Sequence, residues 1–124
     1  MEVVTRMADG VTCVELTGDL DARSAQGVFS GIVDVMPQGT PLLLDLSGVP
    51  FISSAGLRVL LMVHRRAQGA EVEVALAGLS SHLRNALRVT GFLRLFHIVE
   101  SCSDGVAMLI RQRAAEETDQ EWTK

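Results

Sequence analysis

The spacing of apolar residues changes several times along the chain, and this change limits the fold more than any other feature. Apolar residues recur every second position in strands and every third or fourth in helices. Residues 3–4 and 11–16 flank the turn Ala8-Asp9-Gly10, which predicts a β-hairpin. Residues 22–36 then take helical spacing, and residues 42–46 form a short apolar run typical of a strand covered on both faces. Helices and strands therefore alternate after the hairpin.

The second half of the chain repeats this change of spacing. It predicts a helix over 55–67, a strand over 71–77, a helix from about Ser80 to Gly91, a short strand over 97–99 and a last helix, capped by Ser103 or Asp104, to about Arg113. Strands that alternate with helices imply parallel pairing with right-handed crossovers. We therefore predict one α/β domain over residues 1–113, with a mixed sheet of four to five strands, an N-terminal β-hairpin and four or five helices packed on it.

Charge is distributed unevenly between this domain and the last residues. The net charge of the 124-residue chain is −4 at pH 7. Residues 114–124 carry four acidic residues against Lys124, a net of −3, and have no apolar stripe, so we predict an acidic, disordered tail. The rest of the chain is nearly neutral at −1 and has no basic stripe. Nucleic acid is therefore not an expected partner.

The sequence also lacks the patterns of several other classes of protein. Cys13 and Cys102 are far apart and outside any Cys-x-x-Cys pattern, so we expect neither a zinc site nor a disulfide and treat both as small apolar residues. No signal peptide and no membrane-spanning run is evident, so we expect a cytoplasmic location without membrane insertion. Nucleotide and dinucleotide fingerprints are missing, and we expect no metal or cofactor.

The segment from Asp45 to Leu61 carries the most specific pattern. A buried strand turns through Gly48 and Pro50 and places two serines, Ser53 and Ser54, at the start of an apolar helix. Serine is a common helix cap, which is one interpretation of the pair. A phosphate added to either serine would meet unpaired backbone N–H groups and the positive end of the helix dipole. The residues alone therefore allow a simple cap or a phosphorylation site.

Residues 45–61, together with Leu-Thr-Gly-Asp-Leu-Asp over 16–21, closely resemble the STAS-domain anti-sigma-factor antagonists, which are bacterial regulators of partner-switching systems. The resemblance extends over about residues 3–110 and implies a STAS-like fold. In that family an anti-sigma factor that is also a serine kinase phosphorylates a serine at the start of this helix, and a PP2C-type phosphatase removes the phosphate. Aligning the family pattern Asp-Ser-Ser/Thr-Gly-Leu on Gly56 and Leu57 places the acceptor on Ser54. Ser53 then replaces the aspartate and offers a competing acceptor.

The resemblance also implies where the partner binds. Asp21 aligns with an aspartate that the family places beside the phosphoserine loop, although it could equally cap the first helix. On the second helix, Arg58 and Met62 share the face opposite the apolar stripe, and exposed methionine beside arginine is typical of contact surfaces. The residues expected to contact the partner are Asp19, Asp21, Ser53, Ala55, Gly56, Leu57, Arg58 and Met62.

Three functions follow from these observations. The first is a non-enzymatic switch that binds a kinase-type anti-sigma factor until Ser54 is phosphorylated. The second is a STAS scaffold or accessory subunit that works without phosphorylation, in a stress-sensing assembly or a lipid transporter. The third is a serine hydrolase, since Gly56 supplies half of a Gly-x-Ser-x-Gly elbow, but Ile52 occupies the other glycine position. His64 belongs to the apolar stripe, and His82 and His97 are isolated in sequence, so no base is evident for such an enzyme.

Overall fold

The computed structural model describes residues 1–36 and 39–122, with side chains described up to residue 115. Within these residues the chain forms a five-stranded sheet, four α-helices and one short 3-10 helix. The elements are β1 (Glu2–Ala8), β2 (Val11–Thr17), α1 (Ala25–Asp34), β3 (Leu42–Gly48), α2 (Ser54–Gly69), β4 (Val74–Ala77), α3 (Ser81–Thr90), η1 (Phe92–Leu95), β5 (His97–Val99) and α4 (Cys102–Trp122). The predicted α/β class, mixed sheet and N-terminal hairpin are confirmed.

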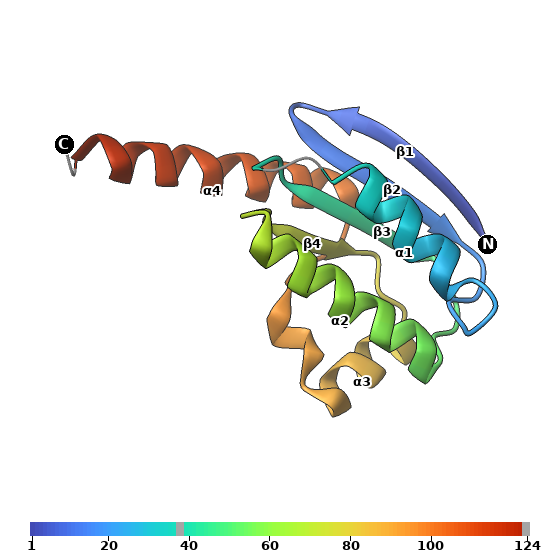
Figure 1. Ribbon diagram of the computed structural model, residues 1–124. Coiled ribbons are helices and arrows are strands. Elements are labelled where there is room, and N and C mark those ends of the chain that lie inside the picture. Colours follow the sequence, from blue (N-terminus) through green and yellow to red (C-terminus); the bar gives the residue numbers. More distant parts are fainter. Residues whose placement is uncertain (37–38, 123–124) are drawn as a thin grey trace.

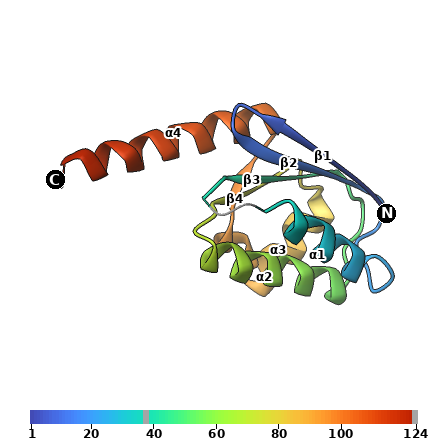
Figure 2. The same ribbon diagram turned by 45° about the horizontal axis from the view of Figure 1, so that its top comes forward.

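The strands lie side by side in the order in which they occur in the sequence (Figure 1). β1 and β2 are antiparallel, and Asp9 and Gly10 between them both have positive φ, 51° and 83°, as a two-residue hairpin turn requires. β2 to β5 are parallel, and each right-handed crossover steps in the same direction. As a result α1, α2 and α3 cover one face of the sheet, and α4 lies on the other (Figure 2).

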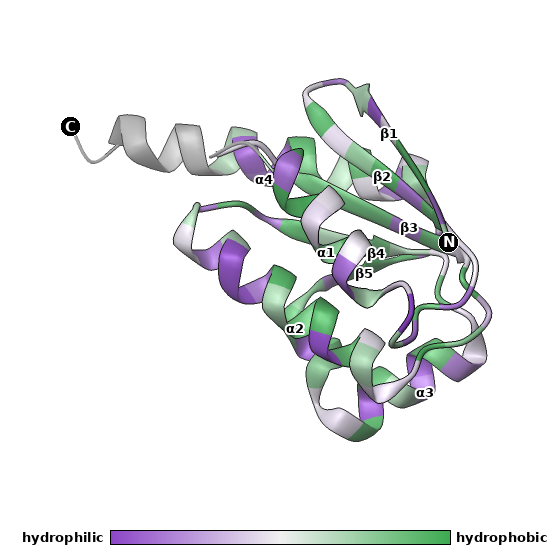
Figure 3. Cartoon of the chain, turned by 45° about the vertical axis from the view of Figure 1, so that its right-hand side comes forward, coloured by the Kyte–Doolittle hydropathy of each residue, from purple (hydrophilic) through white to green (hydrophobic). Residues whose placement is uncertain are grey.

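The apolar core has two parts, one on each face of the sheet. On β3, Leu42 and Leu44 contribute to the larger cluster beneath α1, α2 and α3, whereas Leu43 packs with Val106 and Leu109 of α4. The hydropathy colouring in Figure 3 shows the central strands as predominantly apolar. The run over 42–46 is therefore covered on both faces, as its composition predicts.

Two element boundaries differ from the predicted ones. β4 begins at Val74 rather than residue 71, because α2 continues to Gly69 and Glu71 takes a positive φ of 57° in the following turn. The first predicted helix begins at Ala25 rather than residue 22.

The last helix also differs, at both of its ends. The residue that caps α4 is Ser101, whose Oγ accepts a hydrogen bond from the Asp104 backbone N–H at 3.2 Å. At its other end, α4 extends past the sheet to Trp122 rather than ending near Arg113 (Figure 1). Alanine, glutamate and glutamine favour helix even without an apolar stripe. The remaining tail residues, 123–124, lie outside the described residues, and the division of the chain into a domain and an acidic tail stays a prediction.

Candidate functional site

The two serines at the start of α2 have different roles in the structure. Ser53 is the N-cap: its backbone is extended (φ −94°, ψ 177°), and its Oγ accepts a hydrogen bond from the Gly56 backbone N–H at 3.3 Å. Ser54 is the first residue of the helix, and its side chain is exposed. Within the described part of the chain the Ser54 hydroxyl makes no hydrogen bond. The structure therefore leaves Ser54 accessible and engages Ser53 in capping.

Gly56 allows the first turn of α2 to pack directly on the neighbouring loop. A Cβ at this position would lie closer than 3.0 Å to the Leu20 carbonyl oxygen and to the Ile52 side chain. Gly56 is also buried, so it has no side-chain surface to offer a partner. The structure thus gives Gly56 a packing role, and its predicted contact with the partner stays a prediction.

The loop after β2 lies beside the serine turn. The Leu20 backbone N–H donates to the Phe51 carbonyl, and the Ser53 backbone N–H donates to the Leu20 carbonyl, both at 3.0 Å. These bonds join the loop that contains Asp19 and Asp21 to the segment that contains the two serines. The carboxyl ends of β2 and β3 therefore present the predicted aspartates and serines at one edge of the sheet.

The Asp21 carboxylate is engaged in the turn that precedes α1. Its Oδ1 accepts hydrogen bonds from the backbone N–H groups of Arg23 at 2.9 Å and Ser24 at 3.3 Å. Ser24 Oγ in turn donates to the Asp19 carbonyl oxygen at 2.9 Å. Asp21 therefore caps this turn rather than α1 itself, whose N-cap is Ser24, and the Asp19 side chain is exposed. Both aspartates line a cavity of about 580 Å³ between β1 and α1.

A groove between α1 and α2 begins at the residue after Ser54. It has a volume of about 450 Å³ and is lined by Ala25, Gln26, Phe29, Ser30, Ala55, Arg58, Val59 and Met62. Three of the predicted contact residues, Ala55, Arg58 and Met62, therefore share one surface, and the Met62 side chain is 38% exposed. Leu57 is half-buried against the core instead. The α1 wall of this groove was not predicted, because helical spacing assigned Phe29 to the core.

An aromatic contact beside the serine turn was also not predicted. The Phe51 ring, in the turn before Ser53, stacks on the His82 ring of α3 with 5.3 Å between centroids and 14° between planes. His82, which looks isolated in the sequence, is thus next to the site in space. Sequence spacing alone cannot show this contact, because the two residues are 31 positions apart and on different elements.

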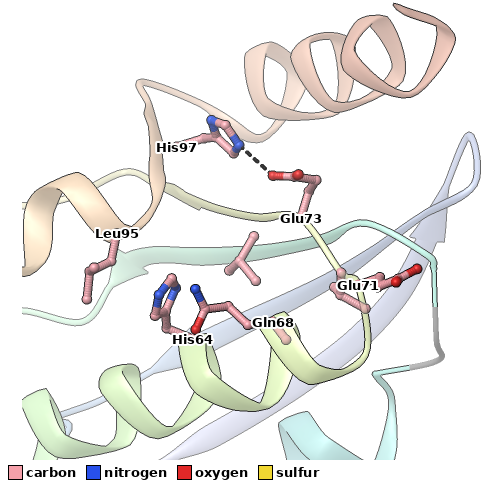
Figure 4. Close-up of a pocket in the computed structure, with 9 residues that line it drawn as sticks. His64, Gln68, Glu71, Glu73, Leu95 and His97 are labelled. Atoms are coloured by element: carbon pink, nitrogen blue, oxygen red, sulfur yellow. Dashed lines mark hydrogen bonds and ion pairs between the residues drawn. The ribbon is translucent and has the colours of Figure 1, made fainter. Parts of the chain in front are cut away.

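Another cavity, of about 560 Å³, lies at the far end of α2 from Ser54 (Figure 4). His97 Nε2 lies 2.8 Å from Glu73 Oε2, and the His64 ring packs edge-on against Phe96 with 5.6 Å between centroids. Among the described residues no hydrogen bond joins Ser54 to His64, His82 or His97, so the structure shows no serine–histidine pair at the start of α2. The described residues also contain no group of three His, Cys, Asp or Glu side chains able to hold a metal ion.

On the opposite face of the sheet, a half-buried polar pair joins β3 to the start of α4. The Cys102 thiol donates a hydrogen bond to Asp45 Oδ2 at 3.1 Å, and the Ser47 backbone N–H donates to Oδ1 at 3.0 Å. Burial disfavours the charged Asp45 carboxylate, but these hydrogen bonds outweigh it and hold the pKa of Asp45 below its ordinary value. Burial and the Asp45 contact raise the pKa of Cys102 to about 12. Cys13 and Cys102 are both free thiols in this structure.

Comparison with known proteins places this geometry in a family. The family model described as the STAS domain matches residues 2–105. The chain belongs to the STAS domain family. BtrV of Bordetella bronchiseptica, named provisionally as an anti-sigma factor antagonist, is 29% identical over 102 residues, covering 82% of this chain and 88% of BtrV. The anti-sigma-F factor antagonist RsfB of Mycobacterium tuberculosis is 25% identical over 99 residues, covering 79% of this chain and 80% of RsfB.

The same STAS fold is present in solved structures. The anti-sigma factor antagonist SpoIIAA, a Bacillus cell fate determinant, matches in its unphosphorylated form with a TM-score of 0.67 and 16% identity, covering 89% of this chain and 98% of SpoIIAA. Its phosphorylated form matches with the same TM-score and 15% identity, covering 87% of this chain and 99% of SpoIIAA. In the described ranges of this STAS domain, none of the helices has the length and apolar character that crossing a membrane requires.

Proposed function

We propose that this STAS domain is an anti-sigma factor antagonist whose binding is switched off by phosphorylation of Ser54. The observation that carries the proposal is the division between the two serines: the Ser54 hydroxyl is exposed and makes no hydrogen bond within the described residues, whereas the Ser53 hydroxyl caps α2. Relatives named as anti-sigma factor antagonists support the regulatory role. SpoIIAA, which shares the fold, is known in unphosphorylated and phosphorylated forms.

The partner in this proposal is an anti-sigma factor that is also a serine kinase, acting in the cytoplasm. It binds the unphosphorylated domain over the serine turn, the exposed Asp19 side chain and the groove between α1 and α2. Ala55, Arg58 and Met62 lie on this surface next to the acceptor, so a kinase that binds the groove has Ser54 within its footprint. The kinase supplies ATP, a PP2C-type phosphatase reverses the reaction, and the STAS domain itself catalyses nothing.

Phosphorylation would change the partner's binding far more than it changes the fold. A phosphoserine brings about −1.5 to −2 charges at neutral pH. At the first residue of α2 that charge faces the positive end of the helix dipole, and the first turn of α2 contains no acidic residue to oppose it. In a desolvated interface the same charge is costly, and a shift of about 5.5 kcal/mol takes occupancy from 99:1 to 1:99. The domain therefore stays folded while the partner is released.

Phosphopeptide mapping of the protein from its own cells, together with intact mass measured with and without phosphatase, tests the assignment. We expect one phosphate, located on Ser54, that is lost in Ser54→Ala and kept in the matched control Ser53→Ala. A phosphate located on Ser53 would overturn the choice of acceptor. The absence of phosphate under all growth conditions would favour the phosphorylation-independent scaffold or accessory subunit instead.

A further inference from the structure

We infer that the outer edge of β1 pairs with β1 of a second copy of this chain and forms a symmetric homodimer. β1 is an edge strand of the sheet, and Figures 1 and 2 show it along one margin of the molecule with no helix over its outer side. Large apolar side chains on it are exposed: Val3 by 38%, Val4 by 44% and Met7 by 63%. This surface is separate from the groove between α1 and α2, and the inference does not depend on the proposed switch.

β1 has few of the features by which proteins protect a sheet edge. Such edges are usually kept short, bent by a bulge, interrupted by proline or covered by another element. β1 is seven residues long, contains no proline and pairs with β2 through seven consecutive residue pairs without a register shift. Its outer backbone groups therefore form a regular row of donors and acceptors, and a sixth strand from another molecule could pair with them without rearrangement of the fold.

The charges on β1 favour a second copy as that partner. Glu2 and Arg6 lie on the same face of the strand, two residues on either side of Val4. If two β1 strands pair antiparallel about Val4, Glu2 lies opposite Arg6 of the partner subunit. By the twofold symmetry, Arg6 also lies opposite Glu2 of the partner subunit. Val4 then faces Val4 of the partner subunit. One strand thus carries both halves of a self-complementary contact, as a twofold interface requires.

The position of Arg6 is compatible with this second contact. Arg6 Nε already donates to Glu15 Oε1 of the same chain at 3.0 Å, which holds the side chain on that face of the sheet. A guanidinium has five N–H donors, so its terminal nitrogens can still donate to Glu2 of the partner subunit. Arg6 also remains half exposed in the single chain, with 50% of its side chain accessible. The intramolecular pair therefore orients Arg6 for the intermolecular one.

Because pairing about Val4 places Glu2 opposite Arg6 of the partner subunit, charge-reversal variants at these two positions test this pairing register. The mass of the unphosphorylated full chain is measured by analytical ultracentrifugation over a range of concentrations, for wild type, Glu2→Arg, Arg6→Glu and an equimolar mixture of the two variants. A single strand pair is smaller than a standard interface, so we expect a reversible dimer in the wild type. Each variant alone places like charges opposite one another at two positions and should raise the dissociation constant about tenfold. The mixture restores both opposite-charge pairs and should dimerise again.

Controls separate this contact from effects on folding. Glu15→Gln removes the intramolecular partner of Arg6 but no intermolecular pair, so it should keep the dimer within about threefold in affinity. Thermal unfolding of each variant confirms that it is folded. A wild type that stays monomeric at all concentrations would overturn the inference, and so would a mixture that dimerises no better than its components. Open-ended assemblies larger than a dimer, or association unaffected by either variant, would also contradict it. None of these outcomes bears on phosphorylation of Ser54.

Discussion

At the scale of single residues, the structure separates two serines that the sequence leaves equivalent. Ser53 and Ser54 are adjacent, and serine is favoured at a helix cap wherever it occurs, so composition cannot decide which one caps. The extended backbone of Ser53 and its contact with the Gly56 N–H decide it. Of the two, Ser54 is the one that is exposed and whose hydroxyl has no hydrogen bond to the described residues.

The first prediction concerns the stability of the two alanine variants. Ser53→Ala removes the cap of α2 and should lower the free energy of unfolding by about 1 kcal/mol. Ser54→Ala removes an exposed hydroxyl and should change it by less than about 0.5 kcal/mol. Urea denaturation of the unphosphorylated proteins measures both values. Equal losses, or a larger loss for Ser54→Ala, would mean that the capping assignment is wrong.

A second residue-scale prediction concerns Gly56. Gly56→Ala would push a Cβ against Leu20 and Ile52 and should destabilise the domain by about 1–3 kcal/mol. Gly31→Ala is the matched control, because Gly31 lies inside α1 and its added Cβ would meet nothing within 4 Å. That control should stabilise the domain by about 0.5–1 kcal/mol. Thermal or urea unfolding of the pair checks the prediction, and a Gly56→Ala domain as stable as wild type would contradict the close packing.

At the scale of elements, the α1–α2 groove shows what sequence patterns miss. The face of α2 with Arg58 and Met62 follows from helical spacing, and the exposure of Met62 confirms it. The opposite wall depends on how α1 docks, because Phe29 is half-buried between the core and the groove. Periodicity gives the direction of a side chain from its own helix but not the gap left between two helices.

The groove leads to a binding prediction. Met62→Asp places a charge among the side chains that line the groove, and it should weaken binding of the kinase-type partner at least about tenfold. Because Met62 is 38% exposed, the stability of the domain should change little. Isothermal titration against the purified anti-sigma factor measures the affinity. Val89→Asp is a suitable control, since Val89 is an exposed apolar residue, 72% accessible, on α3, and should leave the affinity unchanged.

The contact between β3 and α4 gives a pH-dependent prediction. The Cys102 thiol stabilises the folded state while it is protonated, and its pKa rises from 9.0 to about 12 on folding. The stability that it contributes should be fully present below pH 9 and lost as the pH rises towards 12. The pKa of Asp45 is lowered below 3.8, so its contribution is present above that value and is lost as the pH falls through the folded-state pKa.

Urea denaturation at several pH values tests this contact. The difference in unfolding free energy between wild type and Cys102→Ala should be about 1 kcal/mol at pH 7 and should shrink above pH 9 and in acid. A difference that is constant from pH 3 to pH 11 would show that the thiol contributes only by packing.

At the scale of the whole molecule, the sequence predicts the order of the elements well but only some of the contacts between them. The changes of apolar period give the hairpin and the alternation of helix and strand, and the right-handed crossover rule then places α1 to α3 on one face. The length of α4 was underestimated because its last residues have no apolar stripe, although their helix propensity is high. The Phe51–His82 stack and the Asp45–Cys102 hydrogen bond join distant residues that no local pattern connects.

In the proposed switch, the charge changes at one exposed residue of a domain that otherwise keeps its fold. The measurement that tests this most directly is the affinity of the partner anti-sigma factor for the domain before and after stoichiometric phosphorylation of Ser54, with circular dichroism recorded on both forms. We predict an affinity loss on the order of 10⁴-fold with unchanged secondary structure. Equal affinity of the two forms, with phosphate confirmed on Ser54, would contradict the account.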